Sequence, residues 1–217
     1  FMKKLFIIGL LGFVGFSSFI TDFDFSCIEL PSTPYNYANI EVPSDVIATA
    51  SNFDNMPADN PTTDLGATLG RVLFYDVDLS KIRTVSCASC HKQEFSFSDT
   101  ALLSVGFDGG LTHRNSMNLN YSRFRHDTTF FWDGRAGSLE IQSLMPMQDP
   151  VEMGMTLDSI IERVQSKPFY GPLFEAAFGT PEVTSDRIAK AISQFERSMN
   201  TFSNRFRLGA DILIANH

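Results

Sequence analysis

Apolar residues recur every three to four positions in three stretches of this chain, which is the spacing of one face of a helix. Asp64, Thr156 and Ser185 precede these faces, and their short polar side chains are expected to cap the three helices. We interpret the faces as the core of the domain rather than as binding sites. Their apolar positions are Leu65, Leu69, Val72 and Leu73, then Leu157, Ile160, Ile161 and Val164, then Ile188, Ala191, Ile192, Phe195 and Met199.

Two shorter helices are predicted as well. Residues 138–147 form one, which should stop or kink around Pro146 because proline interrupts helical hydrogen bonding. Residues 173–178 form the other, closed by Gly179. No stretch shows the alternation typical of strands, so the predicted fold class is all-α with long loops and few or no strands.

Two long segments lack helical periodicity. Residues 21–63 contain five prolines among many Asn, Asp and Ser residues, which predicts an extended N-terminal arm or linker rather than a helix. Residues 95–131 are rich in Gly, Asn, Ser and Arg. A loop of that length in a compact domain usually serves a function.

The N-terminal residues 1–20 predict a signal peptide, because two lysines precede an apolar run that ends in small residues. The expected location is therefore the periplasm. An uncleaved membrane anchor is the alternative, although the run is at the short edge of the ~20 residues that span a bilayer. Cys27 is interpreted as a spare thiol, since the three residues before it fit a lipidation site poorly.

Composition narrows the function classes. The chain has 217 residues, 43% hydrophobic and 19% charged, which is typical of a globular domain with a real core. Its net charge of -8 argues against a nucleic-acid partner, for which a basic face is expected. Three cysteines are too few for a disulfide scaffold.

The run from Cys87 to His91 carries the most specific chemistry. It is a Cys-x-x-Cys-His motif, the attachment signal of a c-type haem. Two cysteines three positions apart lie on one face of a helical turn, which Thr84 or Ser86 could cap. There Cys87 and Cys90 can form thioethers with the two vinyl groups of one porphyrin, and His91 can offer its imidazole to the iron.

A redox dithiol and a zinc site fit the motif less well than haem does. A dithiol redox pair is expected in a βαβ context and gives no role to the histidine. A structural zinc site needs four ligands, and the sequence has no second cysteine pair. A haem capped on both sides would carry electrons, whereas one with an open distal side can activate peroxide. Methionines are plentiful, so composition alone does not exclude an electron carrier.

Several stretches recur here in the order seen in one family. They are Leu69-Gly70, Leu73–Asp76, Leu79-Ser80, Cys87–His91, Phe97–Asp99, Gly106–Gly110, Arg114-Asn115, Phe131–Ala136, Leu139, Gln142, Pro146 and Pro150–Gly154. The chain thereby resembles the N-terminal haem domain of bacterial dihaem cytochrome c peroxidases, a group related to the methylamine-utilisation dihaem enzyme. The resemblance implies a cytochrome c-like haem domain over residues 64–207.

The resemblance also implies roles for residues around the haem. His91 matches the proximal ligand of the peroxide-reacting haem, and Glu152 matches the acid–base carboxylate of the distal pocket. Gln142 matches the amide beside that carboxylate, and Pro146 matches a distal-pocket proline. The chemistry agrees, because a carboxyl group in an apolar pocket has a raised pKa and can both take and return a proton.

Two further assignments lie outside the distal pocket. Trp132 matches the tryptophan that relays electrons between two haems, and Asn115 matches a ligand of a calcium ion at the domain interface. Each also has an ordinary structural role open to it. A lone tryptophan is most often core, and an asparagine in a loop is most often a turn former.

The sequence departs from the family pattern at the sixth iron ligand. Counting from His91 without gaps, the second histidine of the resting enzymes falls at Phe107. A phenylalanine cannot bind iron, so we expect a haem that is open on its distal side. His113 or His126 could substitute, although we prefer to interpret both as ordinary loop histidines.

The family also has a second haem domain, and this sequence holds one Cys-x-x-Cys-His motif. We interpret residues 208–217 as the truncated start of that missing domain, and the chain as a fragment that would turn over poorly. The expected function is reduction of hydrogen peroxide with electrons from a small cytochrome c or cupredoxin. A monohaem electron carrier and a dihaem oxidase acting on another substrate are the alternatives. A homodimer is compatible with the resemblance.

Overall fold

The computed structural model describes residues 29–127 and 129–202, and in these ranges the chain is helical, as predicted. β pairing in the described ranges is limited to three isolated bridges. The predicted signal segment, Cys27 and residues 208–217 lie outside the described residues. The helices are α1 (Ser44–Ala50), α2 (Asp64–Tyr75), α3 (Cys87–Cys90), α4 (Leu139–Gln148), α5 (Leu157–Gln165), α6 (Tyr170–Phe178) and α7 (Ser185–Ser198). Single 3-10 turns are η1 (Ser51–Phe53), η2 (Val77–Leu79), η3 (Gln93–Phe95) and η4 (Ser122–Phe124).

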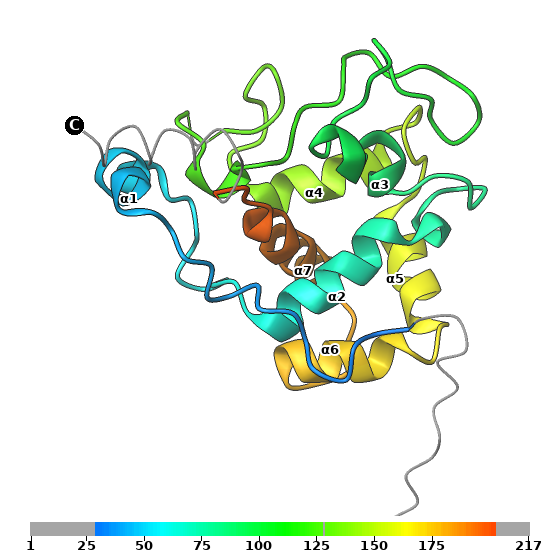
Figure 1. The fold of residues 1–217 in the computed structure, drawn as a ribbon. Helices are drawn as coiled ribbons and strands as arrows, with labels where there is room; N and C mark the ends of the chain where they lie inside the picture. The colour runs from blue at the N-terminus through cyan, green and yellow to red at the C-terminus, as the bar shows by residue number, and fades with distance from the viewer. Residues whose placement is uncertain (1–28, 128, 203–217) are drawn as a thin grey trace, which may run out of the picture.

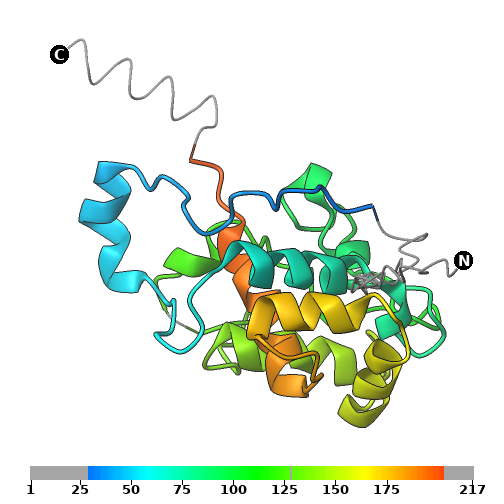
Figure 2. The ribbon, with the colours of Figure 1, turned by 90° about the horizontal axis from the view of Figure 1, so that it is seen from below.

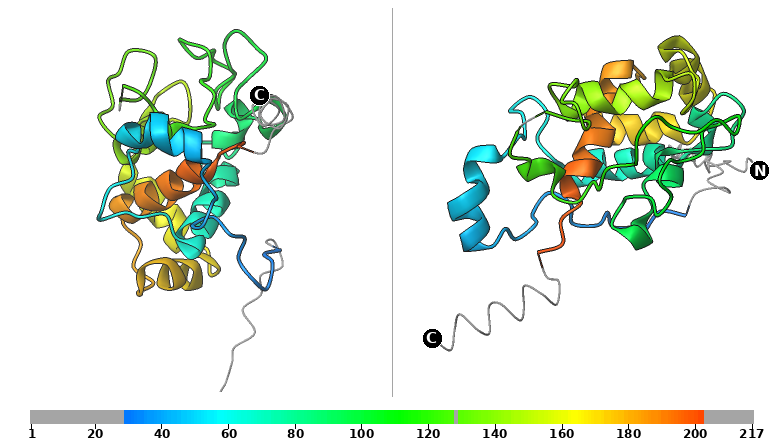
Figure 3. Two further views of the ribbon diagram at one scale, coloured as in Figure 1. Left: turned by 60° about the vertical axis from the view of Figure 1, so that its left-hand side comes forward. Right: turned by 90° about the horizontal axis from the view of Figure 1, so that it is seen from above.

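Helices α2 and α7 pack together at the centre of the domain (Figure 1). Their apolar faces form the core that the periodicity predicts, and Leu73, Ala191 and Ile192 are fully buried between them. Helix α6 covers α2 and lies beside it (Figure 2), whereas α4 packs on α7. This arrangement leaves α3 and α4 facing the long loops at one end of the molecule (Figure 3).

The two central helices approach closely at Gly70. A Cβ atom on this glycine would overlap the backbone carbonyl of Ala191, so only a residue without a side chain fits there. We expect Gly70→Ala to lower the free energy of unfolding by about 1–3 kcal/mol, because α2 and α7 must separate. Urea denaturation measures this loss. Gly137→Ala is the control, since nothing lies within 4 Å of its Cβ position; equal losses in both variants would contradict the packing argument.

Helix starts differ from the prediction by one residue at two places. Thr63, not Asp64, caps α2 by accepting from the amide of Gly66, and Thr184, not Ser185, caps α7. Thr156 caps α5 as predicted. The carboxylate of Asp64 instead accepts the amides of two arm residues, Tyr37 and Ala38, at 2.8 Å each.

Three other boundaries are corrected. Helix α4 continues through Pro146 to Gln148 rather than stopping there, and α6 begins at Tyr170, ahead of the predicted start. The predicted non-helical arm contains α1 and η1. Residues 29–43 contain no helix and run along α2 (Figure 2).

A buried polar network fastens the arm to the helices. Asn60 donates to a carboxylate oxygen of Glu140 on α4 at 2.7 Å and accepts from Gln194 on α7 at 2.8 Å. Arg197 donates to both oxygens of Glu140, at 2.7 and 3.1 Å, and to Asn55 of the arm at 3.1 Å. The network fixes α4 against α7, and these two helices frame the cavity described next.

Within the described ranges, no helix is both long and apolar enough to cross a membrane.

Candidate functional site

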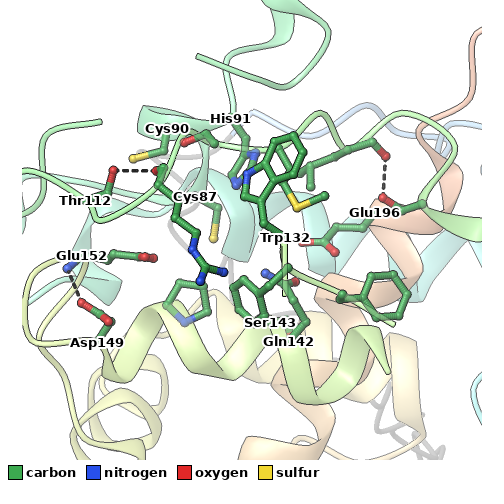
Figure 4. Close-up of a pocket in the computed structure, with 18 of the residues that line it drawn as sticks. Cys87, Cys90, His91, Thr112, Trp132, Gln142, Ser143, Asp149, Glu152 and Glu196 are labelled. Carbon is green, nitrogen blue, oxygen red and sulfur yellow. Dashed lines mark hydrogen bonds between the residues drawn. The ribbon is translucent and has the colours of Figure 1, made fainter. Parts of the chain in front are cut away.

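A cavity of about 330 Å³ lies between α3, α4, α7 and the long loops (Figure 4). This volume is within the range of small-molecule and cofactor sites. The wall formed by α3 carries Cys87, Cys90 and His91, and α4 lies opposite (Figure 4). The sequence-predicted cysteines and histidine therefore face one enclosed space.

Helix α3 is a single turn fixed at its start by Ser86, one of its two predicted caps. Ser86 and Ser89 exchange hydrogen bonds between side chain and backbone in a capping box. This turn places Cys87 and Cys90 on the same wall. Burial raises the pKa of both thiols, which is opposite to the lowered thiol pKa of a reactive dithiol pair. Among the described residues, no group of three or more His, Cys, Asp or Glu side chains could hold a metal ion such as zinc.

Backbone carbonyl groups hold the ring of His91. Its Nδ1 lies 2.9 Å from the carbonyl oxygen of Phe97, and a proton on Nδ1 that donates to this oxygen leaves the lone pair on Nε2. Ser96 and Phe97 both adopt left-handed backbone conformations, with φ of 60° and 58°. Such conformations in residues other than glycine are strained and cluster at functional sites. Here they turn the Phe97 carbonyl toward the imidazole.

Helix α4 supplies the opposite wall with Gln142, Ser143 and Pro146. The side chain of Ser138 caps its first turn, which fixes where the cavity-facing positions lie. Oε1 of Gln142 is buried and has no hydrogen-bond partner among the described residues. A buried acceptor without a partner is uncommon, so this oxygen marks a position where a ligand can bind.

Glu152 enters the cavity from the turn after α4. Asp149 holds this turn by accepting the amides of Val151 and Glu152 at 2.8 and 3.1 Å. Burial raises the pKa of the Glu152 carboxyl group, and the nearby charge of Asp149 adds to this, whereas Arg135 and His113 oppose it. The α5 cap is Thr156, so Glu152 does not have the capping role that an acidic residue before a helix often has.

Trp132 lies on a loop at the cavity mouth. A bridge between Phe130 and Ala136 closes the loop, and the guanidinium of Arg135 stacks 3.5 Å from the ring centre of Phe131. The indole is 61% exposed, and its N–H donates to the backbone carbonyl of Asn115 at 2.9 Å. The side chain of Asn115 donates to the carbonyl of Ala101, so this residue connects two loops.

The match to a known protein family agrees with the placement of two cysteines and a histidine on one wall of the cavity. The family model for di-haem cytochrome c peroxidase matches residues 65–208. The chain belongs to the di-haem cytochrome c peroxidase family.

The family's relatives are longer than this chain. Methylamine utilization protein MauG of Methylorubrum extorquens is 41% identical over 145 residues, which are 66% of this chain and 40% of that protein. Cytochrome c551 peroxidase of Nitrosomonas europaea is 37% identical over 147 residues, 64% of this chain and 41% of that protein. The chain thus spans about two fifths of these relatives.

Solved structures agree on the fold. A MauG-like protein associated with microbial copper homeostasis superposes with a TM-score of 0.70 and 33% identity, covering 81% of this chain and 50% of that structure. The diheme peroxidase BthA from Burkholderia thailandensis superposes with a TM-score of 0.59 and 26% identity, covering 68% of this chain and 42% of its own.

The cavity fits the c-type haem that the family implies. Two cysteines and a histidine share one wall, and Leu119, Phe130, Leu139 and Ile192 are among the apolar residues that enclose the space. Arginine side chains also line the cavity, and guanidinium groups suit the carboxylates of porphyrin propionates. These arginines are Arg114, Arg125 and Arg135.

Most of the predicted site residues line the cavity, but Phe107 and His126 do not. Phe107 packs against Gly154 and its amide donates to the Glu152 carbonyl, so it supports the Glu152 turn from behind. His126 stacks on Phe53, whereas His113 lines the cavity. We expected a haem open on its distal side because Phe107 was counted at the position of the sixth iron ligand. The Phe107 ring does not line the cavity, so its position does not support that expectation.

Sequence reasoning missed several residues of the cavity lining, among them the carboxyl group of Glu196 on α7. The signal was present, because Ile188, Ile192 and Glu196 follow one another at four-residue spacing on the buried face. A carboxylate in an apolar row is expensive to bury, and that cost indicates a specific environment.

Proposed function

We propose that this domain binds one c-type haem through Cys87, Cys90 and His91 and reduces hydrogen peroxide to water. The observation that carries the proposal is the position of Glu152. It lies in the same cavity as His91 and as Gln142 and Pro146 of the opposite wall, and burial raises its pKa. A carboxyl group so placed can take and return a proton inside this cavity.

We assign separate roles in this reaction to the cavity residues of this chain. The haem, held by Cys87, Cys90 and His91, would supply the redox chemistry when bound. Glu152 takes the proton from one peroxide oxygen and returns it to the other as the O–O bond breaks. Gln142 orients peroxide by hydrogen bonds, and Pro146 leaves the nearby wall apolar. Overall, peroxide, two protons and two electrons give two molecules of water.

The electrons must reach the cavity from outside this domain. We propose that Trp132, exposed at the cavity mouth, is the relay, because a large π system suits electron transfer. A second haem, which the family description implies, would pass electrons from a small cytochrome c or cupredoxin. We further propose a periplasmic location and a calcium site that includes Asn115, whose loop Trp132 contacts.

The purified ferric protein tests the proposal. We expect a high-spin absorption spectrum and a rapid spectral change when one equivalent of peroxide is added. Haem should stay attached to the chain after denaturation, and the Cys87→Ala/Cys90→Ala variant should lose this attachment. A low-spin spectrum unaffected by peroxide would favour an electron carrier, since Met117 and Met153 also line the cavity and could bind iron.

An oxidase acting on another substrate is the second candidate. It is supported by the similarity to proteins named for methylamine utilization. Rapid reaction with peroxide followed by slow reduction with every small redox protein tried would favour it.

A further inference from the structure

Glu196 is a second carboxyl group inside the cavity. Only 4% of the residue is exposed, and its Oε2 atom has no hydrogen-bond partner among the described residues. Figure 4 shows its side chain extending from α7 into the cavity, on the opposite side from Glu152. Because buried polar atoms in folded proteins nearly always have partners, this oxygen is placed to interact with something in the cavity.

Among the described residues that line the cavity, Gln142 also has a buried oxygen, Oε1, without a hydrogen-bond partner. It extends from α4 toward the region that Glu196 enters from α7 (Figure 4). The pair of hydrogen bonds from Arg197 to Glu140 fixes these two helices against each other. Glu140 is two residues before Gln142, and Arg197 directly follows Glu196. The clamp therefore sets the separation of the two side chains whose oxygens lack partners.

The surroundings of Glu196 favour its neutral form. Burial raises the pKa of this carboxyl group to about 8; Arg197 opposes the rise and Glu140 adds to it. The guanidinium of Arg197 is occupied by Glu140. From α3, Cys87 faces it and carries no charge, either as a buried thiol or as the thioether of an attached haem, and Arg125, after η4, is engaged by Asp127. The side chains of α2 that pack with apolar residues of α7 include Leu73 and Phe74, which carry no charge.

A neutral carboxylic acid and an amide are complementary. The acid can donate through its O–H, and the amide oxygen can accept, which leaves the two amide N–H donors free. We propose that Glu196 is a positioning residue whose O–H donates to Oε1 of Gln142 and so turns the Gln142 amide N–H groups toward the centre of the haem cavity. The contact itself is independent of the reaction, whereas its use in holding peroxide rests on the proposed function.

The contact makes the amide orientation dependent on pH. When Glu196 loses its proton, both of its oxygens can only accept, so the favourable partner becomes the N–H side of Gln142. The amide would then rotate and present its oxygen to the cavity centre, where it cannot donate to peroxide. Reactivity should therefore fall as pH rises through about 8, the pKa of the Glu196 carboxyl group.

Infrared spectroscopy of the resting haem protein, with glutamate labelled at its side-chain carboxyl carbon, tests the contact. We expect a band of a protonated carboxyl group at pH 7 that disappears with a midpoint near pH 8. Glu196→Gln should remove the band, Glu152→Gln should keep it, and Gln142→Leu should shift its frequency. Absence of the band at pH 7, or a band at the same frequency in Gln142→Leu, would overturn the proposal.

Single-turnover reaction with peroxide tests the positioning. Glu196→Leu should slow the reaction at pH 7 by about tenfold, the effect of losing one hydrogen bond. Glu196→Gln keeps a neutral donor, so it should restore most of this loss and abolish the fall in rate above pH 8. A fall above pH 8 that persists in Glu196→Gln would contradict the proposal. If the unaltered protein does not react with peroxide, the proposed function is refuted. The infrared measurement would still show whether Glu196 donates a hydrogen bond to Gln142.

Discussion

Replacing Glu152 with glutamine is expected to slow the reaction of the ferric haem protein with peroxide by about 10²–10⁴-fold. The variant keeps the size and hydrogen-bonding capacity of the side chain but cannot take or return a proton. The turn should survive, because Asp149 binds its backbone amides and not the Glu152 side chain. Stopped-flow absorption under single-turnover conditions gives the rate.

Glu175→Gln is the matched control, since Glu175 is exposed on α6 and is not part of the cavity lining. It should react like the unaltered protein. The rate of the unaltered protein should rise from acidic pH as Glu152 ionises, with a midpoint above the ordinary value of 4.5, because burial raises this pKa. A Glu152→Gln variant that reacts within a few-fold of the unaltered protein would exclude the assigned proton transfer.

Replacing Arg197 with methionine is expected to lower the free energy of unfolding by about 3–5 kcal/mol, the cost of leaving a buried charge unpaired. Arg197 is 1% exposed and donates to both oxygens of Glu140. Urea denaturation followed by circular dichroism measures the loss. Asp186→Asn provides a contrast, because its ion pair with Lys190 is on the surface and should contribute less than about 1 kcal/mol.

Acid should weaken the same interaction. Burial alone would raise the pKa of Glu140, but hydrogen bonds from Arg197 and Asn60 outweigh it and lower the pKa below 4.5. The stabilisation is therefore present above pH 4.5 and is lost as pH falls through the lowered pKa of the folded state. The double variant Arg197→Met/Glu140→Leu should recover much of the loss, because two apolar side chains replace the pair. Equal instability of the single and double variants would contradict the argument.

The helical faces could be predicted because burial follows the helix period. Helix caps could not be placed to the residue, since Thr63 and Asp64 are both good caps and stand side by side. The choice depends on the arm, which takes the Asp64 carboxylate for the amides of Tyr37 and Ala38. The course of α4 through Pro146 likewise depends on packing that no local pattern reveals.

Part of the site could likewise be predicted from the sequence, and part of it could not. Covalent chemistry requires Cys87, Cys90 and His91 at fixed spacing, so the sequence alone predicts that they face one space. The closeness of Glu152 and Gln142 to them could be inferred only through the family resemblance, because at least fifty residues separate them along the chain. Glu196 was missed because its helix face was interpreted as uniform core. An ungapped count placed Phe107 at an iron-ligand position, whereas a loop turns it behind Glu152.

The hydrogen bonds of Arg197 and Gln194 also bear on the order of folding. They join α7 to arm residues more than 130 positions earlier, at Asn55 and Asn60. Contacts between distant parts of a chain form slowly, so the arm can be fastened only after α7 has been synthesised and has docked. Until then the cavity lacks the wall that Ile192 and Glu196 provide. The Cys87 and Cys90 thiols are consequently more accessible before α7 docks than afterwards, so we expect covalent haem attachment to precede complete folding of the domain.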